Sequence, residues 1–276
     1  MNKRKIVKLK RTADRVITVV LWLYLAVFCY ALLHYGRRIF VAERFNIPTS
    51  SMYPTLQPGD RVWVNKLLFG GRIYKSFNFE DHAPLECFRM PGTREIMPGD
   101  IICFNYPLGY DEWTHIEFKI NYVYCKRVFG TPGDTIAIKD GINWHNNYDK
   151  PIGVLENQEA LQVTPDSILW KYNFMQTMPF TMPVWTKKNF GPLYVPEAVV
   201  LDSLKRALYF PVIEYETGAF PDDSLKTYTF VNNYYFALGD NSLDSNDSRY
   251  WGFIPEDFII GIVTKISRNG RIMSAK

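Results

Sequence analysis

The sequence predicts a mainly β fold, in which an N-terminal transmembrane helix precedes a strand-rich, partly barrel-like domain that carries an inserted second subdomain. Three observations indicate this. One uncharged apolar run lies near the start of the chain, and many short runs after it alternate with period two. A stretch rich in proline and tryptophan interrupts these runs. With 276 residues, 47% of them hydrophobic, the chain can bury a sizeable core.

The apolar run at residues 16–33 predicts the transmembrane helix. It contains no charged residue, and at ~1.5 Å per residue it extends ~27 Å, enough to cross the hydrocarbon layer with Trp22 and Tyr35 at the interfaces. A cleavable signal peptide is the alternative, but it usually has a shorter apolar core and a small-x-small cleavage site, which the sequence around Leu32 and His34 lacks. We therefore expect residues 16–35 to remain as an anchor.

The positive charge of the chain is concentrated before the anchor. Residues 1–15 carry a net charge of +6, whereas the whole chain carries +4, so the remainder is slightly acidic. Basic residues beside a membrane helix stay on the cytoplasmic side, which predicts a cytoplasmic tail at 1–15, an exported domain after the anchor and the lipid bilayer as a partner. Nucleic acid is excluded as a partner, because its binding requires a basic patch on the folded domain.

Period-two patterns rich in branched and aromatic residues predict the strands of the exported domain. These strands are residues 61–66, 100–104, 121–129, 134–138 and 227–238. A Pro-Gly-Asp turn precedes three of them. Between residues 143 and 221 the pattern loosens, so we interpret 143–221 as the inserted subdomain, with a short helix at Asp202–Leu208. The main domain then comprises 36–142 and 222–276.

The cysteines and histidines predict neither a metal site nor a cofactor. Outside the anchor the cysteines form no CxxC pair, and one disulfide among the three remains open in an oxidising compartment. They are Cys87, Cys103 and Cys125. His115 and Glu117 could place two ligands on one face of a strand, but we expect them to be a solvated surface pair.

A serine between two prolines is the first candidate for chemistry. Ser51 lies between Pro48 and Pro54, and proline restricts both its own backbone and that of the residue before it. Ser51 is therefore held on a stiff segment, as a nucleophile requires. Most serines with such neighbours are ordinary loop residues, so this interpretation depends on a base elsewhere in the chain.

Lys126 is the candidate base. Strand alternation places it on one face with Tyr124 and Val128, and it turns Arg127 to the other face. A lysine acts as a base only when it is neutral, which from the ordinary pKa costs ~4.6 kcal/mol at pH 7. Burial among apolar neighbours lowers that pKa. Most lysines on strands instead extend their head group into water, so a third segment must support the assignment.

The third segment is residues 239–255, Gly-Asp-Asn-Ser-Leu-Asp-Ser-Asn-Asp-Ser-Arg-Tyr-Trp-Gly-Phe-Ile-Pro. With the Ser51 segment, the Lys126 segment and the strand after Pro98, it resembles the ordered boxes of bacterial type I signal peptidases, or leader peptidases, a family of serine-lysine dyad proteases. The resemblance covers the anchor and residues 45–70, 97–104, 122–141 and 235–266. Each box is specific, and all occur in the family's order.

The resemblance implies a role for each matching residue. Ser51 would be the nucleophile and Lys126 the general base, with no histidine used. The Thr49 hydroxyl and the Ser51 backbone N–H would form the oxyanion hole. Ser245 would hydrogen-bond the base, and Asp247 with Arg249 would form a supporting ion pair. The walls of the substrate pocket, which would admit only alanine-sized side chains, would be Phe45, Ile47, Met52, Tyr124 and Cys125.

The implied function is that of a membrane-bound serine endopeptidase, which removes N-terminal signal peptides from secretory preproteins after a small-x-small motif. It would lie in the bacterial cytoplasmic (inner) membrane as a single-pass protein, with a cytoplasmic N-terminus and a periplasmic catalytic domain. The alternatives are a self-cleaving regulatory protease of the related serine-lysine type and a catalytically silent, membrane-tethered β-domain scaffold. Intact Ser51 and Lys126 argue against the scaffold.

Three features depart from the family pattern. Ser242 stands where the family usually has arginine, and Leu243 replaces a commonly polar residue. The structural support that the arginine gives is therefore in doubt, although every proposed catalytic position is retained. Residues 71–96 have no counterpart, and they would form either a β-extension over the lipid surface or a plain loop. The sequence makes no prediction of the oligomeric state.

Overall fold

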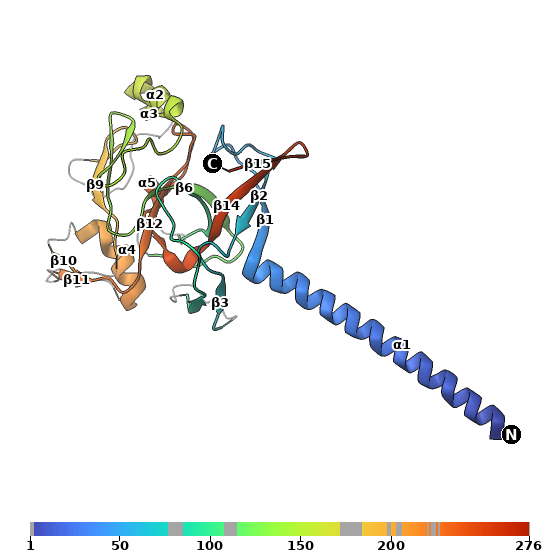
Figure 1. The fold of residues 1–276 in the computed structure, drawn as a ribbon. Coiled ribbons are helices and arrows are strands. Elements are labelled where there is room, and N and C mark those ends of the chain that lie inside the picture. The colour runs from blue at the N-terminus through green and yellow to red at the C-terminus, as the bar shows by residue number, and fades with distance from the viewer. Residues whose placement is uncertain are drawn as a thin grey trace.

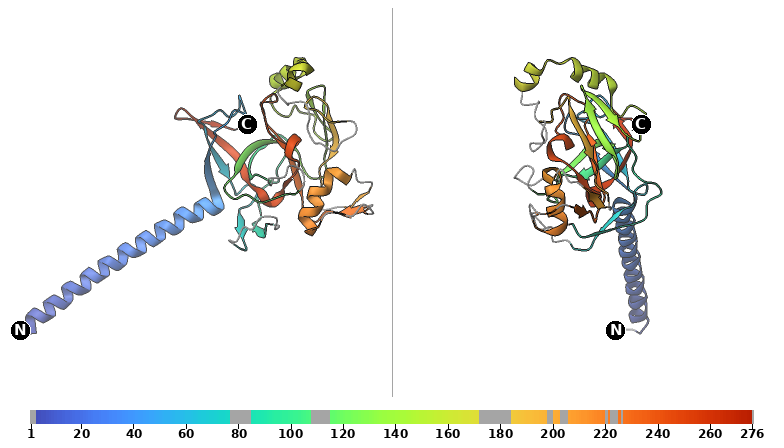
Figure 2. Two further views of the ribbon diagram at one scale, coloured as in Figure 1. Left: turned by 180° about the vertical axis from the view of Figure 1, so that it is seen from behind. Right: turned by 90° about the vertical axis from the view of Figure 1, so that its left-hand side faces the viewer.

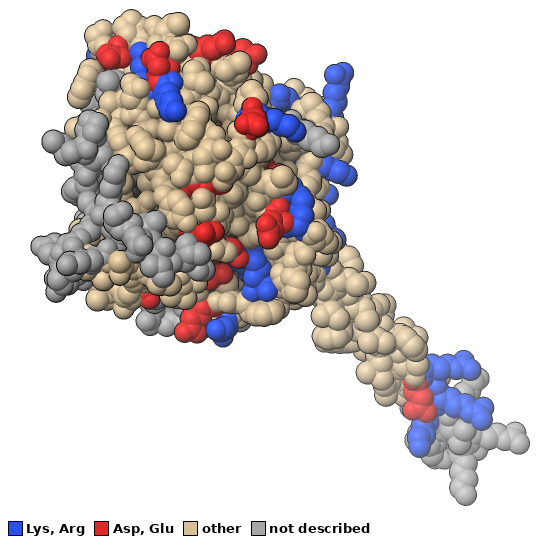
Figure 3. All heavy atoms as spheres, turned by 60° about the vertical axis from the view of Figure 1, so that its left-hand side comes forward, with Lys and Arg blue, Asp and Glu red and all other residues tan. Residues whose placement is uncertain are grey.

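The first described element is one long helix. The computed structural model describes residues 3–76, 85–107, 115–171, 184–197, 200–202, 206–219, 221, 225 and 227–275. Helix α1, Lys3–Gly36, continues into a π-helical turn, Arg37–Val41. The segment Lys10–Val41 is long and apolar enough to cross a membrane, and none of its most apolar window is buried. Residues 16–36 of α1 contain no charged residue, and the face of α1 seen in Figure 3 is uncharged between its basic N-terminal end and the domain.

The main sheet has eight strands among the described residues and curls into a partial barrel (Figure 1). Its order is β1, β2, β14, β5, β6, β12, β13, with β15 paired to β14, and all of these pairs are antiparallel. The strands are β1 Ala42–Asn46, β2 Arg61–Asn65, β5 Ile101–Asn105, β6 Val123–Gly130, β12 Tyr234–Leu238, β13 Ile254–Pro255, β14 Ile259–Arg268 and β15 Arg271–Ser274. The predicted mainly β class with a partial barrel is confirmed.

The elements of residues 143–221 lie on the β12 side of the main sheet, whereas α1, β1 and β2 lie on the other (Figures 1 and 2). Strands β8, β7 and β9 form a three-stranded sheet, so the insertion pairs with β7 of the main domain. The additional elements are β7 Thr135–Lys139, β8 Ile142–His145, α2 Leu155–Val163, α3 Asp166–Lys171, β9 Phe190–Tyr194, β10 Val200–Asp202, α4 Arg206–Thr217 and β11 Thr227–Thr229. The predicted domain boundaries stay a prediction.

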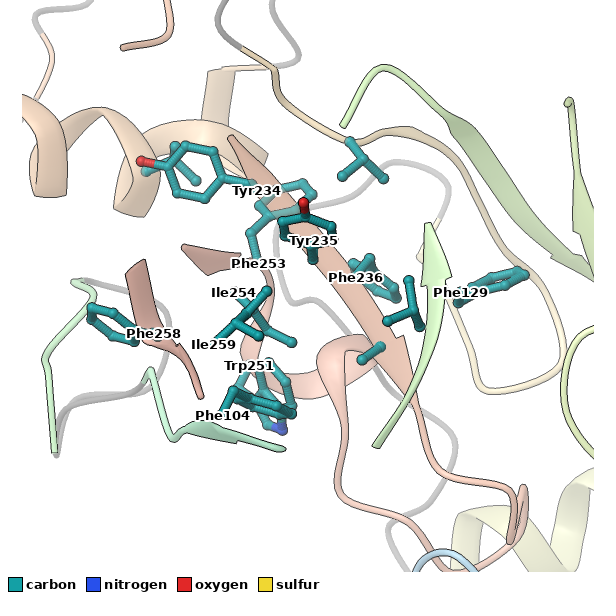
Figure 4. Close-up of a cluster of buried hydrophobic side chains, with 14 of the residues drawn as sticks. Phe104, Phe129, Tyr234, Tyr235, Phe236, Trp251, Phe253, Ile254, Phe258 and Ile259 are labelled. Carbon is teal, nitrogen blue, oxygen red and sulfur yellow. The ribbon is translucent and has the colours of Figure 1, made fainter. Parts of the chain in front are cut away.

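One aromatic-rich core joins the main domain to the inserted elements. Figure 4 shows part of this cluster, in which Tyr234 and Phe236 of β12 lie beside Phe253. Edge-to-face contacts with ring centroids 6.0 Å and 6.5 Å apart connect Phe253 to Phe236 and Tyr234, and such contacts add to the stabilisation from burial. Phe190 and Val212 of the insertion belong to the same cluster. The insertion is therefore packed onto the sheet through a shared core.

A second, smaller core lies under the other end of the sheet. It is entirely apolar, and its buried members come from β2, β5, β14, the segment that follows β1 and Ala275 after β15. Met52 and Leu56 are 1% and 0% exposed there. They anchor the turn that follows β1, because burying an apolar side chain of this size is favourable by ~1.5–3 kcal/mol relative to leaving it exposed to water.

Two predicted elements differ in extent from those in the structure. The strand predicted at 227–238 is interrupted, because Glu216 of α4 accepts hydrogen bonds from the backbone N–H groups of Val231 and Asn232 at 2.9 Å and 2.8 Å. The helix predicted at Asp202–Leu208 instead begins at Arg206, as α4, and continues to Thr217. Asp202 cannot join it, since it ends β10, which pairs with β11. The remaining predicted strands are confirmed to within two residues.

The prediction that His115 and Glu117 form a solvated surface pair is wrong. Glu117 is 2% exposed, and its Oε1 lies 2.8 Å from His115 Nε2. Lys119 Nζ also contacts the Glu117 carboxylate. A carboxylate is retained in such a buried position when cations and donors surround it.

Residues 71–96 contain a short hairpin. Strand β3, Arg72–Tyr74, pairs with β4, Cys87–Arg89, and residues 77–84 between them lie outside the described part. Ile73 and Phe88 are register partners, and they are 41% and 57% exposed. The hairpin therefore presents an exposed apolar pair, which agrees with the β-extension rather than with a plain loop; its contact with lipid stays a prediction.

Candidate active site

Ser51 lies in the turn after β1 and is held there from both sides. The buried Met52 and Leu56 anchor the turn in the smaller core, and Leu56 N–H donates to the Met52 carbonyl at 2.9 Å. The Ser51 carbonyl accepts a hydrogen bond from the backbone N–H of Asn241 at 3.1 Å. The Ser51 side chain itself remains partly exposed. A fixed but accessible hydroxyl results, as the sequence predicted from the flanking prolines.

Lys126 of β6 brings its amine to that hydroxyl. Its Nζ donates to Ser51 Oγ at 2.6 Å and to Ser245 Oγ at 3.2 Å. Lys126 is 1% exposed, so water does not compete for the amine. When the amine is neutral, its lone pair can instead accept the hydroxyl proton across the same short distance.

The environment of Lys126 favours the neutral amine. Burial lowers the pKa of Lys126 from 10.5 to about 8; Arg249 also lowers it, whereas the carboxylates of Asp247, Asp240 and Asp244 oppose this shift. At pH 7 the neutral form then costs ~1.4 kcal/mol, compared with ~4.6 kcal/mol for an unperturbed lysine. Burial of Lys126 thus removes most of the cost of using lysine as a base.

Ser245 lies in the loop between β12 and helix α5, Ser248–Trp251. It is 5% exposed and contacts Lys126 through its hydroxyl. Gly239 makes this approach possible, since a Cβ built on it would lie 2.1 Å from Ser245 Oγ and 2.4 Å from the Ser51 carbonyl oxygen. No side chain larger than hydrogen fits between the two serine segments. The predicted proximity of Ser245 to Lys126 is present in the structure.

Asp247 and Arg249 form a fully buried ion pair behind Ser245. Arg249 Nε and Nη2 donate to the Asp247 carboxylate at 2.8 Å and 2.7 Å, and the two side chains are 0% and 2% exposed. Asp247 also accepts from the Gly239 backbone N–H at 3.0 Å. Burial alone would raise the pKa of Asp247, but the Arg249 guanidinium holds it at about 2. The pair fixes both ends of the loop that carries Ser245.

Thr49 lies beside the candidate nucleophile. Its Oγ1 is 3.4 Å from Ser51 Oγ, and either hydroxyl can be the donor. The Thr49 side chain is exposed, so it is free to rotate toward a group bound at Ser51. This position is compatible with a donor to an oxyanion, and the role of Thr49 stays a prediction.

Of the five predicted pocket residues, the structure brings four together. Phe45, Ile47, Met52 and Cys125 belong to the smaller apolar core. Tyr124 packs against the larger core instead, where its ring stacks on Tyr106 with centroids 4.6 Å apart. Cys125 is also bonded to Cys103, its register partner on β5. This disulfide resolves the question that the cysteine count left open.

Sequence reasoning missed an ion pair on the opposite face of β6. Arg127 Nε and Nη2 donate to Asp240 Oδ1 and Oδ2, both at 2.7 Å, and the Asp240 side chain is 1% exposed. Such bidentate pairs fix orientation. The pair ties β6, one residue after Lys126, to the loop that carries Ser245. Lys126 therefore contacts Ser51, whereas Arg127 pairs with Asp240. The only signal for this in the sequence was the prediction that their side chains point to opposite faces of the strand.

The chain is similar to known proteins over most of its length. The family model described as "Signal peptidase, peptidase S26" matches residues 19–267. A signal peptidase I of Rickettsia akari is 32% identical over 240 residues, which cover 86% of this chain and 75% of that protein. A signal peptidase I of Buchnera aphidicola from Acyrthosiphon pisum is 29% identical over 243 residues, covering 83% and 69%.

Among solved structures, a signal peptidase I from Enterococcus faecalis V583 matches 62% of this chain and 97% of that chain, at 21% identity and a TM-score of 0.32. The family assignment rests on the family model and the sequence relatives. The family model and the sequence relatives define a hydrolase of the serine endopeptidase class. The chain belongs to the signal peptidase family, peptidase S26.

Proposed function

We propose that this chain removes N-terminal signal peptides from exported preproteins, cutting after a small-x-small motif, with Ser51 as nucleophile and Lys126 as general base. The observation that carries the proposal is the 2.6 Å contact between Lys126 Nζ and Ser51 Oγ in a buried environment. The family membership supports the peptidase activity. The lowered pKa of Lys126, about 8, supports the choice of base.

The reaction follows from this geometry. Neutral Lys126 accepts the Ser51 proton as Oγ attacks the scissile carbonyl, and the Thr49 hydroxyl with the Ser51 N–H stabilises the oxyanion that forms. The Lys126 ammonium then protonates the leaving amine, which releases the mature protein and leaves an ester on Ser51. Water, deprotonated by Lys126, hydrolyses that ester and restores the serine. Ser245 directs the amine throughout these steps.

We also propose that α1 is the membrane anchor of a single-pass protein in the bacterial inner membrane. The uncharged surface of α1 and the basic residues at its N-terminal end support a cytoplasmic tail and an outward-facing catalytic domain. The exposed apolar pair Ile73 and Phe88 supports contact of the hairpin with the lipid surface. A domain placed there meets preproteins where they leave the bilayer.

The pocket proposal concerns residues next to the scissile bond. Phe45, Ile47, Met52 and Cys125 supply bulky apolar walls near the Ser51 turn, and bulky walls admit only small side chains by steric exclusion. Tyr124 would contribute from the opposite side of β6. Enlarging this pocket should therefore widen the range of accepted residues more than it slows cleavage of the preferred ones.

The experiment is cleavage of a labelled preprotein by the detergent-solubilised full chain. We expect Ser51→Ala and Lys126→Ala to abolish cleavage, because the first removes the nucleophile that gives up the proton and the second removes the base that accepts it. Ser274→Ala and Lys265→Ala, at exposed positions on β15 and β14, are the matched controls and should cleave normally. Cleavage that persists in both site variants would reject the mechanism. Absence of cleavage by the unmodified chain and all variants would favour the scaffold.

A further inference from the structure

A single side chain of the insertion connects the two loops of the site. Asn157 of α2 donates through Nδ2 to the carbonyl oxygens of Tyr53 at 2.8 Å and Asp240 at 2.7 Å. Tyr53 lies two residues after Ser51, and Asp240 follows Gly239. An amide nitrogen carries two N–H donors, and both are used here. Asn157 therefore fixes the spacing between the nucleophile turn and the Ser245 loop.

A buried lysine of the insertion contacts the same loop farther along. Lys187 is 1% exposed, and its Nζ donates to the Leu243 carbonyl at 2.9 Å. The amine also lies 5.4 Å from the ring centroid of Tyr250, within the range of a cation–π contact. Leu243 precedes Ser245 by two residues, and Tyr250 follows Arg249. Lys187 thus contacts the chain on both sides of Ser245.

The side chain of Leu243 is held by the insertion as well. It packs against Leu161 of α2 and Leu169 of α3, each 1% exposed. A polar residue at this position would leave an unpaired group between two helices, which costs free energy. Leu243, which departs from the family pattern, is therefore explained by its apolar contacts with the insertion of this chain.

The charged groups near Lys187 are those that also surround Lys126. Burial and Arg249 lower the pKa of Lys187 to about 7, whereas Asp247 and Asp244 oppose this shift. Arg249, Asp247 and Asp244 act on Lys126 too. The loop that carries Ser245 thus places the same charged side chains near both buried amines.

We propose that Lys187 and Asn157 are positioning residues, through which the insertion holds the 239–247 loop so that Ser245 stays within hydrogen-bond reach of Lys126. This inference rests on the proposed roles of Ser51 and Lys126. Neither positioning residue reaches the reacting atoms, so their loss should lower kcat while KM for the preprotein stays nearly constant. A role in fold stability alone would lower the melting temperature and leave the kcat of the folded enzyme unchanged.

The first experiment compares Lys187→Met, Lys187→Gln and the control Lys188→Met in the full chain. The neighbouring Lys188 pairs with Asp166 within the insertion, at 3.0 Å. We expect Lys187→Met to lower kcat about tenfold or more, because small misplacements of a catalytic group have effects of this size. Lys187→Gln, which keeps an N–H donor, should recover part of the loss, and Lys188→Met should match the unmodified chain. A kcat within about twofold for Lys187→Met would overturn the proposal.

The second experiment tests whether Lys187 acts through Ser245. In a Ser245→Ala background, Lys187→Met should change kcat by less than about twofold, because residues that act through one another are not additive. Equal effects in both backgrounds would overturn the proposal.

If Lys187→Met does not fold, Asn157→Leu decides instead, with the same expected loss of kcat and constant KM. If Ser51→Ala and Lys126→Ala retain activity, the proposed function is rejected. If these two variants lose activity but the variants of Lys187 and Asn157 are normal, only the positioning role is rejected.

Discussion

Gly239 faces Ser245 with no space for a methyl group between them. A Cβ at Gly239 would lie 2.1 Å from Ser245 Oγ, much closer than two non-bonded heavy atoms can approach. The same atom would lie 2.4 Å from the Ser51 carbonyl oxygen. The glycine thus sets how closely the Ser51 and Ser245 segments approach, and with them the position of the hydroxyls around Lys126.

Gly239→Ala should therefore inactivate the enzyme. Both serine segments must move apart, and a displacement of about 1 Å in a catalytic group lowers the rate by about a hundredfold. The measurement is kcat for preprotein cleavage, with the melting temperature determined in parallel. Gly36→Ala is the control, because Gly36 has a helical φ of −58° and, beyond its own helix backbone, no atom within 4 Å of its Cβ position. Activity close to normal in Gly239→Ala would show that Ser245 is not required near Lys126.

The pH profile of cleavage should report Lys126. Activity should fall as the pH drops through about 8, the pKa of this amine, because protonation removes the base. The profile of kcat/KM measures this value in the free enzyme. His115→Asn serves as control, since His115 lies beside Glu117 and outside the site. An acidic limb that disappears in this variant would assign the base to the imidazole.

Lys126→Met should make the folded chain more stable at neutral pH while it abolishes activity. Lys126 binds its proton less tightly in the folded chain, with a pKa of about 8, than in the unfolded chain, where the pKa is near 10.5. Lys126 therefore lowers the free energy of unfolding by about 3 kcal/mol below pH 8, where it is protonated in both states. This destabilisation of the folded chain disappears as the pH rises toward 10.5. Denaturant unfolding at pH 7 and pH 10 measures the difference. A methionine variant less stable than the unmodified chain at pH 7 would contradict this.

Thr49→Val should lower kcat about a hundredfold if the Thr49 hydroxyl stabilises the oxyanion. Valine keeps the shape of threonine and removes only its donor, which lies 3.4 Å from Ser51 Oγ. KM should change little, because the interaction forms mainly in the transition state. Thr49→Ser retains the donor and is the matched control. Equal kcat values in the valine and serine variants would assign the oxyanion hole to other donors.

The sequence predicted those parts of the fold and site that depend on local pattern. Alternating residues indicated β2, β5, β6 and β7, and the flanking prolines indicated the fixed turn at Ser51. The resemblance then placed Lys126, Ser245 and Asp247 together, and the structure has them in contact or within one loop. Local pattern succeeds for these strands and for the Ser51 turn, because consecutive residues show which face of a strand or turn is buried. The proximity of Lys126 and Ser245 was implied by the resemblance alone.

What the sequence did not predict depends on contacts between distant segments. Nothing beside Lys187 or Asn157 in the sequence indicates that they contact a loop more than 50 residues away. Glu216 interrupts the predicted strand at 227–238 through hydrogen bonds from another element. The buried state of Glu117 likewise depends on the tertiary arrangement. Such outcomes follow from three-dimensional packing, which overrides local propensity.

The disulfide between Cys103 and Cys125 gives a chemical test of the register between β5 and β6. The two cysteines are opposite one another in adjacent strands, and Cys125 precedes Lys126. Closing a loop of 22 residues stabilises a chain by about 3 kcal/mol. The double variant Cys103→Ser with Cys125→Ser should therefore unfold at lower denaturant, and Cys87→Ser is its control.

Alkylation followed by mass spectrometry tests the same pairing without substitution. In the folded, unreduced chain, neither Cys103 nor Cys125 should be modified, and both should become reactive after reduction and unfolding. Cys87 should react slowly in the folded chain, because burial and Asp257 raise the pKa of its thiol to about 12 and leave almost no thiolate at neutral pH. Rapid alkylation of Cys125 in the unreduced chain would show that the disulfide between Cys103 and Cys125 is absent.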